Sequence, residues 1–515
     1  MNGAQALMQT LVDSGVDTCF MNPGTSEMHF VAALDSVHEM HSVLALFEGV
    51  ATGAADGYAR MAGRPAATLL HLGPGLGNGL ANLHNARKAN TPIVNIVGDH
   101  ATYHKQYDAL LESDIETVAR NVSSFIRTSQ QPADVSADAA AAVAAAMGPP
   151  GQVATLILPA DAAWGDPATP APPVVPVAAG APDPVQIQAI ATALRAGEPS
   201  ALFVGGRACR AATLVDASRA ANAVGATLLC ETFPARLERG AGVPPVERLG
   251  YFAEFAAVQL AGLRHLVLID SKAPVSFFAY PGKASDLVPE GCEVHALAGP
   301  TDHVGAALAA LADALGAPPD SATLAAAGRP VLPTGALTAD AVCMAVGALL
   351  PDGAIVSDEG QTSASSALRY TAGAPRHDWL SLTGGAIGQG LPVAVGAAVA
   401  CRDRRVIALQ ADGSALYTLQ SWWTMAREHL DITTVIFNNG SYAILNLELN
   451  RVGVDTVGSR ARDMLDLRRP DLDFVALATG LGIPATRATT ADEFVDQFQK
   501  AVATPGPTVI EAIVV

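Results

Sequence analysis

The sequence lacks several features that define whole classes of protein. It contains no tract of lysine or arginine, and its formal net charge is −18 at pH 7. Because nucleic acids and anionic membranes attract basic surfaces, this charge argues against both as partners. No uninterrupted apolar run approaches the roughly 20 residues that a membrane-spanning helix needs. The N-terminal segment 1–17 predicts an amphipathic helix with acidic side chains, not a signal peptide.

Cysteine motifs are also absent. No pair of cysteines has the spacing of a metal site or a redox motif. Such scattered thiols are typical of a reducing compartment, so we expect a cytoplasmic protein. The cysteines are Cys19, Cys209, Cys230, Cys292, Cys343 and Cys401.

A dinucleotide-binding fingerprint is missing as well. The nearest run is Gly73-Pro74-Gly75-Leu76-Gly77-Asn78, which has no glycine at the third required step. Asp99 is only a weak match to the acidic residue that should follow about 20 positions later. A nicotinamide-dependent oxidoreductase therefore stays an unfavoured alternative.

The chain alternates short apolar runs with helical patterns in three units. This alternation predicts an α/β fold class with three doubly wound parallel-sheet domains. Proline- and alanine-rich stretches separate the units and are typical of linkers. The expected domains are residues 1–165, 185–325 and 336–515.

The most informative stretch lies in the third unit, between Val406 and Tyr442. Two predicted strands end at Asp412-Gly413-Ser414 and at Asn438-Asn439-Gly440. The carboxyl ends of parallel strands form the crevice in which open α/β sheets bind ligands. A helix start favours phosphate, and oxygen atoms of Asp and Asn suit a hard divalent cation. Between the strands, the apolar spacing predicts one helix over 415–429 with Ser414 as its cap.

This stretch resembles the diphosphate-binding motif of thiamine-diphosphate enzymes. That motif is Gly-Asp-Gly, a spacer of a little under thirty residues, and Asn-Asn. Asp412 precedes Asn439 by 27 positions, and Ala411 replaces the first glycine of the motif. We expect alanine to be tolerated there unless the backbone needs a positive φ.

The resemblance extends over the whole chain to the pyruvate-oxidase-like superfamily. The first unit is most similar to the benzoylformate decarboxylases, and less similar to the acetolactate synthases. The segments that carry this likeness are Asn22-Pro23-Gly24-Thr25, Glu48 with the helix through Asp56 to Arg60, and His71 followed by Gly75-Leu76-Gly77-Asn78.

The resemblance implies thiamine diphosphate and Mg²⁺ as cofactors. Its metal ligands would be Asp412, Asn439 and the backbone carbonyl of Ser441. The Gly385 carbonyl would accept a hydrogen bond from the cofactor, and Ile387 would be the apolar wedge that bends it. The other expected cofactor contacts are Gln361, Thr362, Gly413, Ser414 and Asn78. FAD, which some relatives bind in the middle domain, is not expected.

The resemblance also assigns the chemistry. Glu48 would exchange a proton with the cofactor's pyrimidine, and His71, with Thr25 or His100, would relay protons at the carbonyl of a 2-oxo acid. The second histidine of benzoylformate decarboxylases should fall within 273–280, where Phe278 or Ala279 stands instead. The family builds each site from two subunits, so a homo-oligomer is implied, usually a dimer of dimers.

Three functions stay open at this point. The first is a lyase or carboligase acting on a 2-oxo acid or an aldehyde. The second is an acetolactate-synthase-type ligation, although Asp99 follows Gly98 where that family has a glutamine. The third is an inactive structural or regulatory member, against which the intact Glu48, Asp412 and Asn439 argue.

Overall fold

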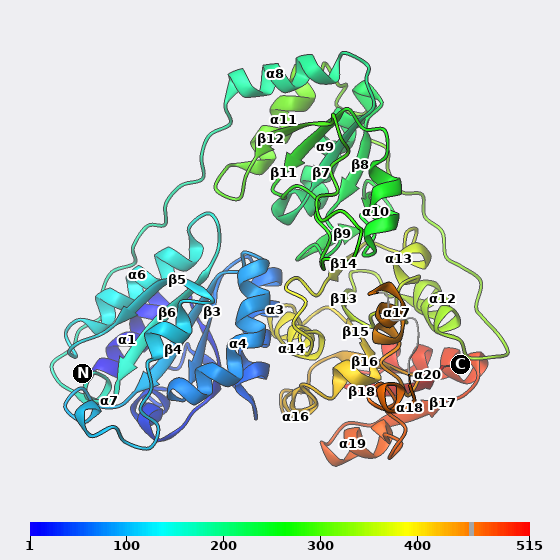
Figure 1. Cartoon of the computed structure of the whole chain (residues 1–515). Coiled ribbons are helices and arrows are strands. Elements are labelled where there is room, and N and C mark those ends of the chain that lie inside the picture. The colour runs from blue at the N-terminus through cyan, green and yellow to red at the C-terminus, as the bar shows by residue number, and fades with distance from the viewer. Residues whose placement is uncertain (453–457, 515) are drawn as a thin grey trace.

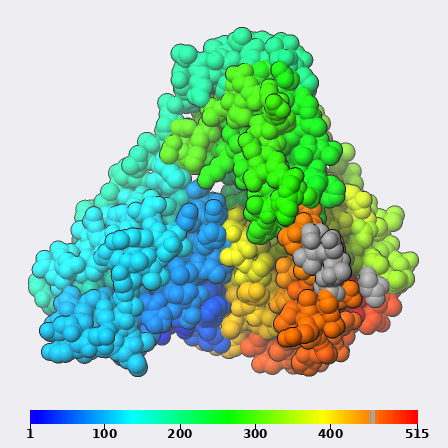
Figure 2. Space-filling model, in the orientation of Figure 1, coloured from blue at the N-terminus to red at the C-terminus, as the bar shows by residue number. Residues whose placement is uncertain are grey.

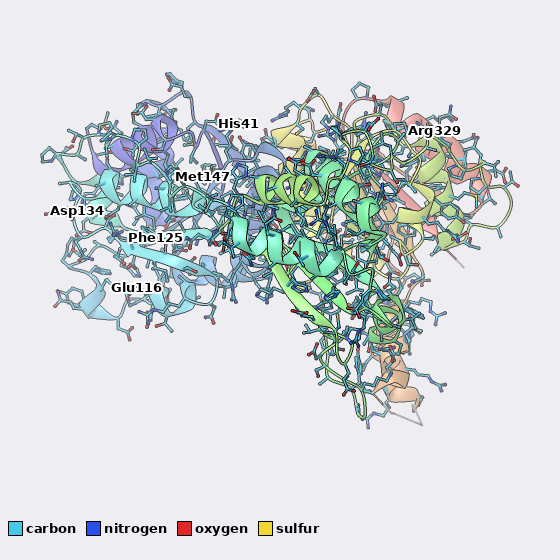
Figure 3. The ribbon with its side chains drawn as sticks, turned by 90° about the horizontal axis from the view of Figure 1, so that it is seen from above. His41, Glu116, Phe125, Asp134, Met147 and Arg329 are labelled. Atoms are coloured by element: carbon cyan, nitrogen blue, oxygen red, sulfur yellow. The ribbon has the colours of Figure 1, made fainter. Side chains whose placement is uncertain are left out.

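The computed structural model describes residues 1–452 and 458–514. The chain forms three α/β domains, each built around its own mainly parallel sheet, as the sequence predicted. The first domain lies to one side of the third, and the central domain lies above both (Figure 1). The space-filling view shows the same three lobes (Figure 2). From above, Phe125 of the first domain and Arg329 of the second connecting segment lie toward opposite ends of the molecule (Figure 3).

The first domain contains a six-stranded parallel sheet in the order β2-β1-β3-β4-β6-β5. Its strands are β1 (Thr18–Asn22), β2 (His41–Leu44), β3 (Ala66–Leu70), β4 (Ile93–Asp99), β5 (Ser123–Thr128) and β6 (Val153–Pro159). Its helices are α1 (Gly3–Asp13), α2 (Met28–Ala33), α3 (Glu48–Ala62), α4 (Leu72–Lys88), α5 (Ile115–Ala119), α6 (Val135–Met147) and α7 (Ala160–Trp164).

Alternate residues of these strands enter two different hydrophobic clusters, one on each face of the sheet. On β3, for example, Leu70 belongs to one cluster and Leu69 to the other. Successive side chains of a strand point to opposite faces, so both faces are covered and the sheet is doubly wound. Near-continuous apolar strands are the sequence signature of such burial.

The central domain contains a five-stranded sheet in the order β10-β8-β7-β11-β12. Its strands are β7 (Ser200–Val204), β8 (Thr227–Cys230), β10 (Glu247–Arg248), β11 (His265–Ile269) and β12 (Glu293–Ala298). Its helices are α8 (Pro184–Leu194), α9 (Ala211–Val224), α10 (Ala253–Leu260) and α11 (Val304–Ala314).

The third domain contains a seven-stranded sheet in the order β17-β18-β16-β15-β13-β14-β9. Its own strands are β13 (Ile355–Glu359), β14 (His377–Leu380), β15 (Val406–Ala411), β16 (Ile432–Asn438), β17 (Ala485–Ala488) and β18 (Thr508–Ile513). Its helices are α12 (Ala339–Leu349), α13 (Ala367–Tyr370), α14 (Gly390–Ala400), α15 (Asp412–Ala415), α16 (Gln420–Arg427), α17 (Ala443–Arg451), α18 (Ser459–Asp463), α19 (Phe474–Gly480) and α20 (Ala491–Ala503).

The seventh strand of this sheet comes from the central stretch of the chain. Strand β9 (Leu237–Arg239) pairs antiparallel with β14, in the register Trp379 to Leu237. The sequence pattern did not predict it, because three residues are too short to show a period. The strand fastens the central domain to the third.

The first and third domains pack through helices α3 and α14, which lie side by side in Figure 1. Glycines make this approach possible: a Cβ on Gly57 would lie 2.1 Å from the Val393 carbonyl oxygen, and one on Gly396 would lie 1.8 Å from that of Ala54. Gly57 on α3 and Gly396 on α14 therefore allow the two helices to pack closely. Among the residues placed in the structure, no helix is long and apolar enough to cross a membrane.

Candidate active site

Asp412 and Asn439 follow the carboxyl ends of two adjacent strands. β15 and β16 are parallel, with Ala411 opposite Phe437, so the two residues come together as the sequence predicted. The Asp412 carboxylate is buried and accepts N–H groups from Gly413 (2.7 Å), Asn439 (3.0 Å) and Gly440 (2.7 Å). The Asn439 side-chain oxygen accepts the N–H of Ser441 (2.9 Å).

These contacts fit a divalent cation with a diphosphate. Burial raises the pKa of Asp412, and its hydrogen bonds to backbone N–H groups lower it only in part. A carboxylate has about four lone-pair sites, so Asp412 retains acceptor capacity for a cation. Asp412, Asn439 and the Ser441 carbonyl supply only oxygen atoms, which Mg²⁺ prefers.

The segment after Asp412 differs from the prediction. The single helix expected over 415–429 is two helices, α15 and α16, with a break between them. The spacing of Leu416, Leu419, Trp423 and Ala426 predicts the buried face of that helix, but Leu416 is 38% exposed. Trp422 and Met425 are fully buried instead. Ser414 lies inside α15 and does not cap it. Its hydroxyl donates to the carbonyl oxygens of Glu359 (3.2 Å) and Ala411 (3.1 Å).

Two small residues shape the turn. Ala411 has φ −78°, an ordinary extended conformation, so the loss of the motif's first glycine costs no backbone strain. Gly413 is different, because a Cβ there would lie 2.4 Å from the ring of Tyr442. The second glycine of the motif, Gly413, is therefore required because a side chain would not fit, and not because of its φ angle.

The loop after β13 reaches the same place. Gln361 adopts φ +51°, and both Gln361 and Thr362 line a cavity of about 150 Å³. Two residues further on, the Ser363 hydroxyl lies 3.5 Å from the Asn439 amide nitrogen. The expected diphosphate-contacting loop is thus adjacent to the Asp412 turn.

The glycine-rich loop 384–388 is held from both sides. The buried carboxylate of Glu359 accepts N–H groups from Gly388 (2.7 Å), Gln389 (3.2 Å) and Gly390 (2.8 Å) at the start of α14. Burial raises the pKa of Glu359 to about 7, although these N–H groups favour its charged form. Sequence reasoning missed Glu359, although it ends the strand before the predicted Gln361 loop. Gly385 takes φ +73°, which glycine permits.

Helix α4 of the first domain forms hydrogen bonds with the other side of the loop 384–388. The Asn82 amide donates to the carbonyl oxygens of Gly49 (2.7 Å) and Gly388 (3.2 Å). Asn85 donates to the Ala386 carbonyl (2.8 Å) and accepts the Ala386 N–H (3.1 Å). These bonds flank Ile387 on both sides, so the position predicted for the wedge is fixed by the first domain.

Glu48 is the first residue of α3, and its side chain is buried. Asn78 donates from its amide to the Glu48 carboxylate (3.0 Å). A Cβ on Gly75 would lie 3.1 Å from Glu48 Oε1 and 3.5 Å from His71 Cβ. The Glu48 carboxylate and His71 are therefore both neighbours of Gly75. The cofactor contact expected of Asn78 stays a prediction.

His71 is held by a carboxylate that sequence reasoning missed. Glu27 Oε2 lies 2.8 Å from His71 Nδ1 and accepts the Gly24 N–H at 2.8 Å. Burial raises the pKa of Glu27, and the facing His71 partly lowers it. Glu27 stands three residues after Gly24 and accepts its N–H, as the acidic residue of a capping box does, but Gly24 has no side chain to complete the motif, so the sequence carried only half of this signal. Thr25, between them, is exposed.

The structure places His100 next to this group, just after β4, which pairs with β3. His100 Nε2 is buried without a hydrogen-bond partner within the described chain, and the ring packs on His104 with centroids 5.4 Å apart. Asp99 is engaged elsewhere, by Lys105 at 2.7 Å. The run 73–78 lies inside α4 and not in a strand-to-helix turn, which argues further against a dinucleotide site.

Aromatic side chains stand where a second histidine was sought. Phe277 stacks on Tyr251 with centroids 5.4 Å apart and contacts Phe233 at 5.6 Å. Phe233 and Tyr251 line the same cavity as Gln361 and Thr362. The central domain therefore gives this cavity an aromatic wall.

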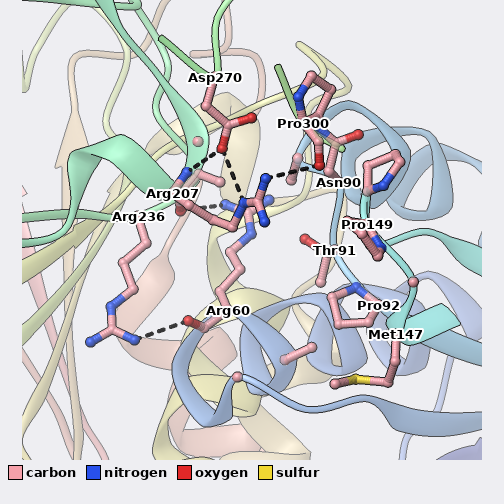
Figure 4. A pocket seen from close by; sticks show the side chains of 18 of the residues that line it. Arg60, Asn90, Thr91, Pro92, Met147, Pro149, Arg207, Arg236, Asp270 and Pro300 are labelled. Atoms are coloured by element: carbon pink, nitrogen blue, oxygen red, sulfur yellow. Dashed lines mark hydrogen bonds and ion pairs between the residues drawn. The ribbon is translucent and has the colours of Figure 1, made fainter. Parts of the chain in front are cut away.

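A second cavity, of about 470 Å³, lies between the first and central domains (Figure 4). Thr91 and Pro149 line it on one side, and Arg207 and Asp270 on the other. Arg207 donates to Asp270 and to the Pro300 carbonyl (2.9 Å), so its charge is already engaged.

Three α/β domains with side-chain oxygen atoms suited to a metal at the β15 and β16 ends, and with Glu48 and His71 both next to Gly75, define a class of cofactor-dependent enzymes. Comparison with known proteins places the chain within it. Residues 1–121 match the thiamine pyrophosphate enzyme N-terminal TPP binding domain, and residues 358–512 match the C-terminal TPP binding domain.

Relatives extend this match to the whole chain. The protein named "Putative acetolactate synthase large subunit IlvX" from Mycobacterium tuberculosis is 60% identical over 100% of this chain and 99% of its own length. A benzoylformate decarboxylase from Pseudomonas aeruginosa is 28% identical over 96% of both chains. The chain belongs to the thiamine-diphosphate-dependent enzymes, in the family of acetolactate synthases and benzoylformate decarboxylases.

A solved structure shares the fold. The thiamine-diphosphate-dependent 4-hydroxybenzoylformate decarboxylase of Rhodococcus jostii RHA1 superposes with a TM-score of 0.86, covering 100% of this chain and 99% of that one. Because the two sequences are only 24% identical, this similarity supports the three-domain fold and nothing more specific.

Proposed function

We propose that the protein uses thiamine diphosphate and Mg²⁺ to decarboxylate a 2-oxo acid, with carboligation to an aldehyde as a second outcome at the same site. One observation carries this proposal: His71, fixed by the buried Glu27, lies next to Gly75, and the Glu48 carboxylate lies next to the same glycine. An imidazole held beside the cofactor-activating carboxylate suits proton transfer to a reacting carbonyl.

Each residue has a defined task in this proposal. When bound, thiamine diphosphate supplies the nucleophilic carbon and the electron sink. Asp412, Asn439 and the Ser441 carbonyl would hold Mg²⁺, which would supply positive charge to bind the diphosphate. Glu48 holds a proton at the pyrimidine nitrogen. His71 delivers or removes a proton at the substrate carbonyl, assisted by Thr25 or His100.

Several contacts support these tasks. Asn78 orients the Glu48 carboxylate. Glu27 fixes His71 by binding Nδ1, which leaves Nε2 for the substrate. Gly24 leaves room for this ring, because a Cβ there would lie 2.3 Å from His71 Nδ1.

The aromatic wall favours a substrate with an apolar side chain. Phe233, Tyr251 and Phe277 offer ring faces, and the Tyr251 hydroxyl, whose pKa burial raises, carries no charge at neutral pH. The alternative is an acetolactate-synthase-type transferase, which the printed name of the 60% identical relative favours. The two reactions differ in the fate of the carbon that remains after CO₂ leaves: a lyase protonates it, and a transferase joins it to a second 2-oxo acid.

A substrate panel separates these reactions. Each 2-oxo acid is offered alone, with an aldehyde, or with a second 2-oxo acid, and CO₂ and the carbon product are measured. Glu48→Gln should retain the thermal shift caused by thiamine diphosphate with Mg²⁺ but lose activity by about 10²- to 10⁴-fold. Glu39→Gln, on an exposed loop, is the control. Full activity in Glu48→Gln, or no thermal shift in the unmodified protein, would refute the proposal.

We further propose a homo-oligomer with active sites at a dimer interface. Within the described part of one chain, no hydrogen bond joins the Glu48 side chain to the third domain. Mixing Glu48→Gln protein with Asp412→Asn protein tests this. Shared sites would restore activity, because each mixed dimer has one intact site. Sites built from one chain would stay inactive in every mixture.

We propose that the central domain binds no flavin. The turn after β7 would need free N–H groups to hold a dinucleotide phosphate. Here the Gly206 N–H donates to Glu231 (3.0 Å) and the Arg207 N–H to Asp270 (2.8 Å). The turn therefore faces the Glu231 carboxyl group, which occupies an N–H that a phosphate would need. Burial raises the pKa of Glu231 to about 7. Purified protein should be colourless, and a flavin absorbance spectrum would contradict this.

The six cysteines are free, which supports a cytoplasmic location as a further part of the proposal.

A further inference from the structure

A group of metal-ligating side chains lies at the edge of the central sheet, outside the site described above. It consists of His265 on β11 and of Glu293 and His295 on β12, whose ligand atoms all lie within 4.8 Å of one another. We propose that these residues bind a transition-metal ion, with Zn²⁺ as the best match to their chemistry.

The sheet itself brings the three residues together. β11 and β12 are parallel neighbours, with His265 opposite Glu293 and Val267 opposite His295. Alternate residues of a strand share a face, so Glu293 and His295 flank His265 on one side of the sheet. His265 Nδ1 lies 3.1 Å from His295 Nε2 and 3.8 Å from Glu293 Oε2.

These distances suit a small tetrahedral site. Zinc binds imidazole nitrogen and carboxylate oxygen at about 2.0–2.2 Å, which places neighbouring ligand atoms roughly 3.3 Å apart. The two imidazoles are already near this separation. The Glu293 side chain is 67% exposed and can rotate to close the remaining gap. Two imidazoles with one carboxylate favour Zn²⁺ over Mg²⁺ or Ca²⁺, which prefer oxygen atoms alone.

A second carboxylate orients the first ligand. Glu198 Oε2 lies 3.2 Å from His265 Nε2, on the side of the ring that faces away from His295. By accepting the Nε2 proton, Glu198 leaves the Nδ1 lone pair for the metal, which is the usual support of a metal-bound histidine. Arg264 lies 4.0 Å from Glu198, so the two carboxylates and one guanidinium leave one negative charge to attract a cation.

The location gives the metal a structural role. β12 is the last strand of the central sheet, and the ion would tie it to β11. His265 is the first residue of β11, and Asp270, which lines the inter-domain cavity, follows the last residue of this strand. The metal group and the cavity therefore lie at opposite ends of β11. Three protein ligands leave a fourth position for water.

Full-length, untagged protein is stripped with a chelator, saturated with thiamine diphosphate and excess Mg²⁺, and titrated with ZnCl₂. We expect one Zn²⁺ per chain after gel filtration and a higher melting temperature, because the ion binds the folded state. The double variant His265→Gln/His295→Gln should lose this zinc, and His38→Gln, at an exposed site, should keep it. Glu198→Gln should weaken zinc binding by about 10- to 100-fold.

Co²⁺ substitution supplies an independent readout. The unmodified protein should show the visible spectrum of tetrahedral cobalt, and Glu293→Gln should alter it even if the double variant fails to fold. Equal zinc content in the unmodified protein and the double variant would overturn the proposal. So would the absence of bound zinc in the unmodified protein, because the two imidazoles would then only share a hydrogen bond.

Discussion

Replacing Arg60 by glutamine should weaken the junction of all three domains. The Arg60 guanidinium donates to Asp56 of its own helix (2.8 and 2.6 Å), to the Ala235 carbonyl (3.1 Å) and to the Ser381 carbonyl (2.9 Å). It also donates to the Thr383 hydroxyl (2.9 Å), one residue before the glycine-rich loop. The side chains of Arg60 and Asp56 are 2% and 0% exposed.

The expected cost follows from this burial. Removing one partner of a buried ion pair leaves the other charge uncompensated and costs about 3–5 kcal/mol. The chain offers a matched control in Arg64 and Asp17, whose ion pair is 2.7 Å long against 2.6 Å for Arg60 and Asp56. Those side chains are 40% and 42% exposed, and such surface pairs contribute about 0–1 kcal/mol. The two arginine substitutions should therefore differ by at least ~2 kcal/mol.

Urea denaturation followed by tryptophan fluorescence measures this difference. Trp379 on β14, close to Ser381, reports on the junction. Arg60→Gln should lower the midpoint strongly and reduce the thermal shift caused by thiamine diphosphate, because the loop 384–388 loses a support. Arg64→Gln should lower the free energy of unfolding by no more than about 1 kcal/mol, and it should leave the thermal shift unchanged. Equal midpoints for the two variants would show that the buried pair contributes no more than a surface pair, and the reasoning would fail.

Three further predictions concern single side chains. Glu27→Gln should lower kcat by about 10²-fold, because His71 loses its charged partner, while the cofactor's thermal shift stays unchanged; an unaltered kcat would remove Glu27 from the site. Burial lowers the pKa of His377 to about 4, so the unfolded chain binds more protons below about pH 6.5. Stability should therefore fall by about 2 kcal/mol between pH 7 and pH 5, seen in urea midpoints, and less so in His377→Phe. Ala411→Gly should lower the unfolding free energy by roughly 0.5–1 kcal/mol through chain entropy and leave cofactor affinity within twofold; much tighter binding would show that the Ala411 methyl obstructs the diphosphate.

The sequence was sufficient wherever a motif stands at the end of a strand. Asp412 and Asn439 are 27 positions apart along the chain, yet parallel pairing of β15 with β16 puts them in contact. His71 and His100 likewise follow the neighbouring strands β3 and β4, so parallel pairing brings both to the same end of the sheet. In such cases the alternation within the strands and the order of the strands determine which residues come together, and both can be read from the sequence.

The sequence was insufficient where tertiary contacts override local pattern. The apolar spacing over 415–429 indicated one helix, but the Thr418 hydroxyl donates to the Gly388 carbonyl (3.2 Å) within the break between α15 and α16. Helix propensity is weaker than such contacts. Strand β9 was missed for a related reason, because its three residues become a strand only through pairing with β14 of another domain.

The candidate site combines residues of the third domain with residues of the first, and only those of the third belong to the diphosphate motif. The third domain provides oxygen ligands whose spacing follows from the cofactor, so a motif records them. The first domain contributes residues whose tasks depend on one another. Glu48 needs Asn78, His71 needs Glu27, and a side chain at Gly75 would crowd the Glu48 carboxylate. Asn82 then joins this group to the glycine-rich loop by binding the carbonyl oxygens of both Gly49 and Gly388. In the function proposed above, substrate selection would depend on this second set and on the aromatic wall, and neither is part of the diphosphate motif.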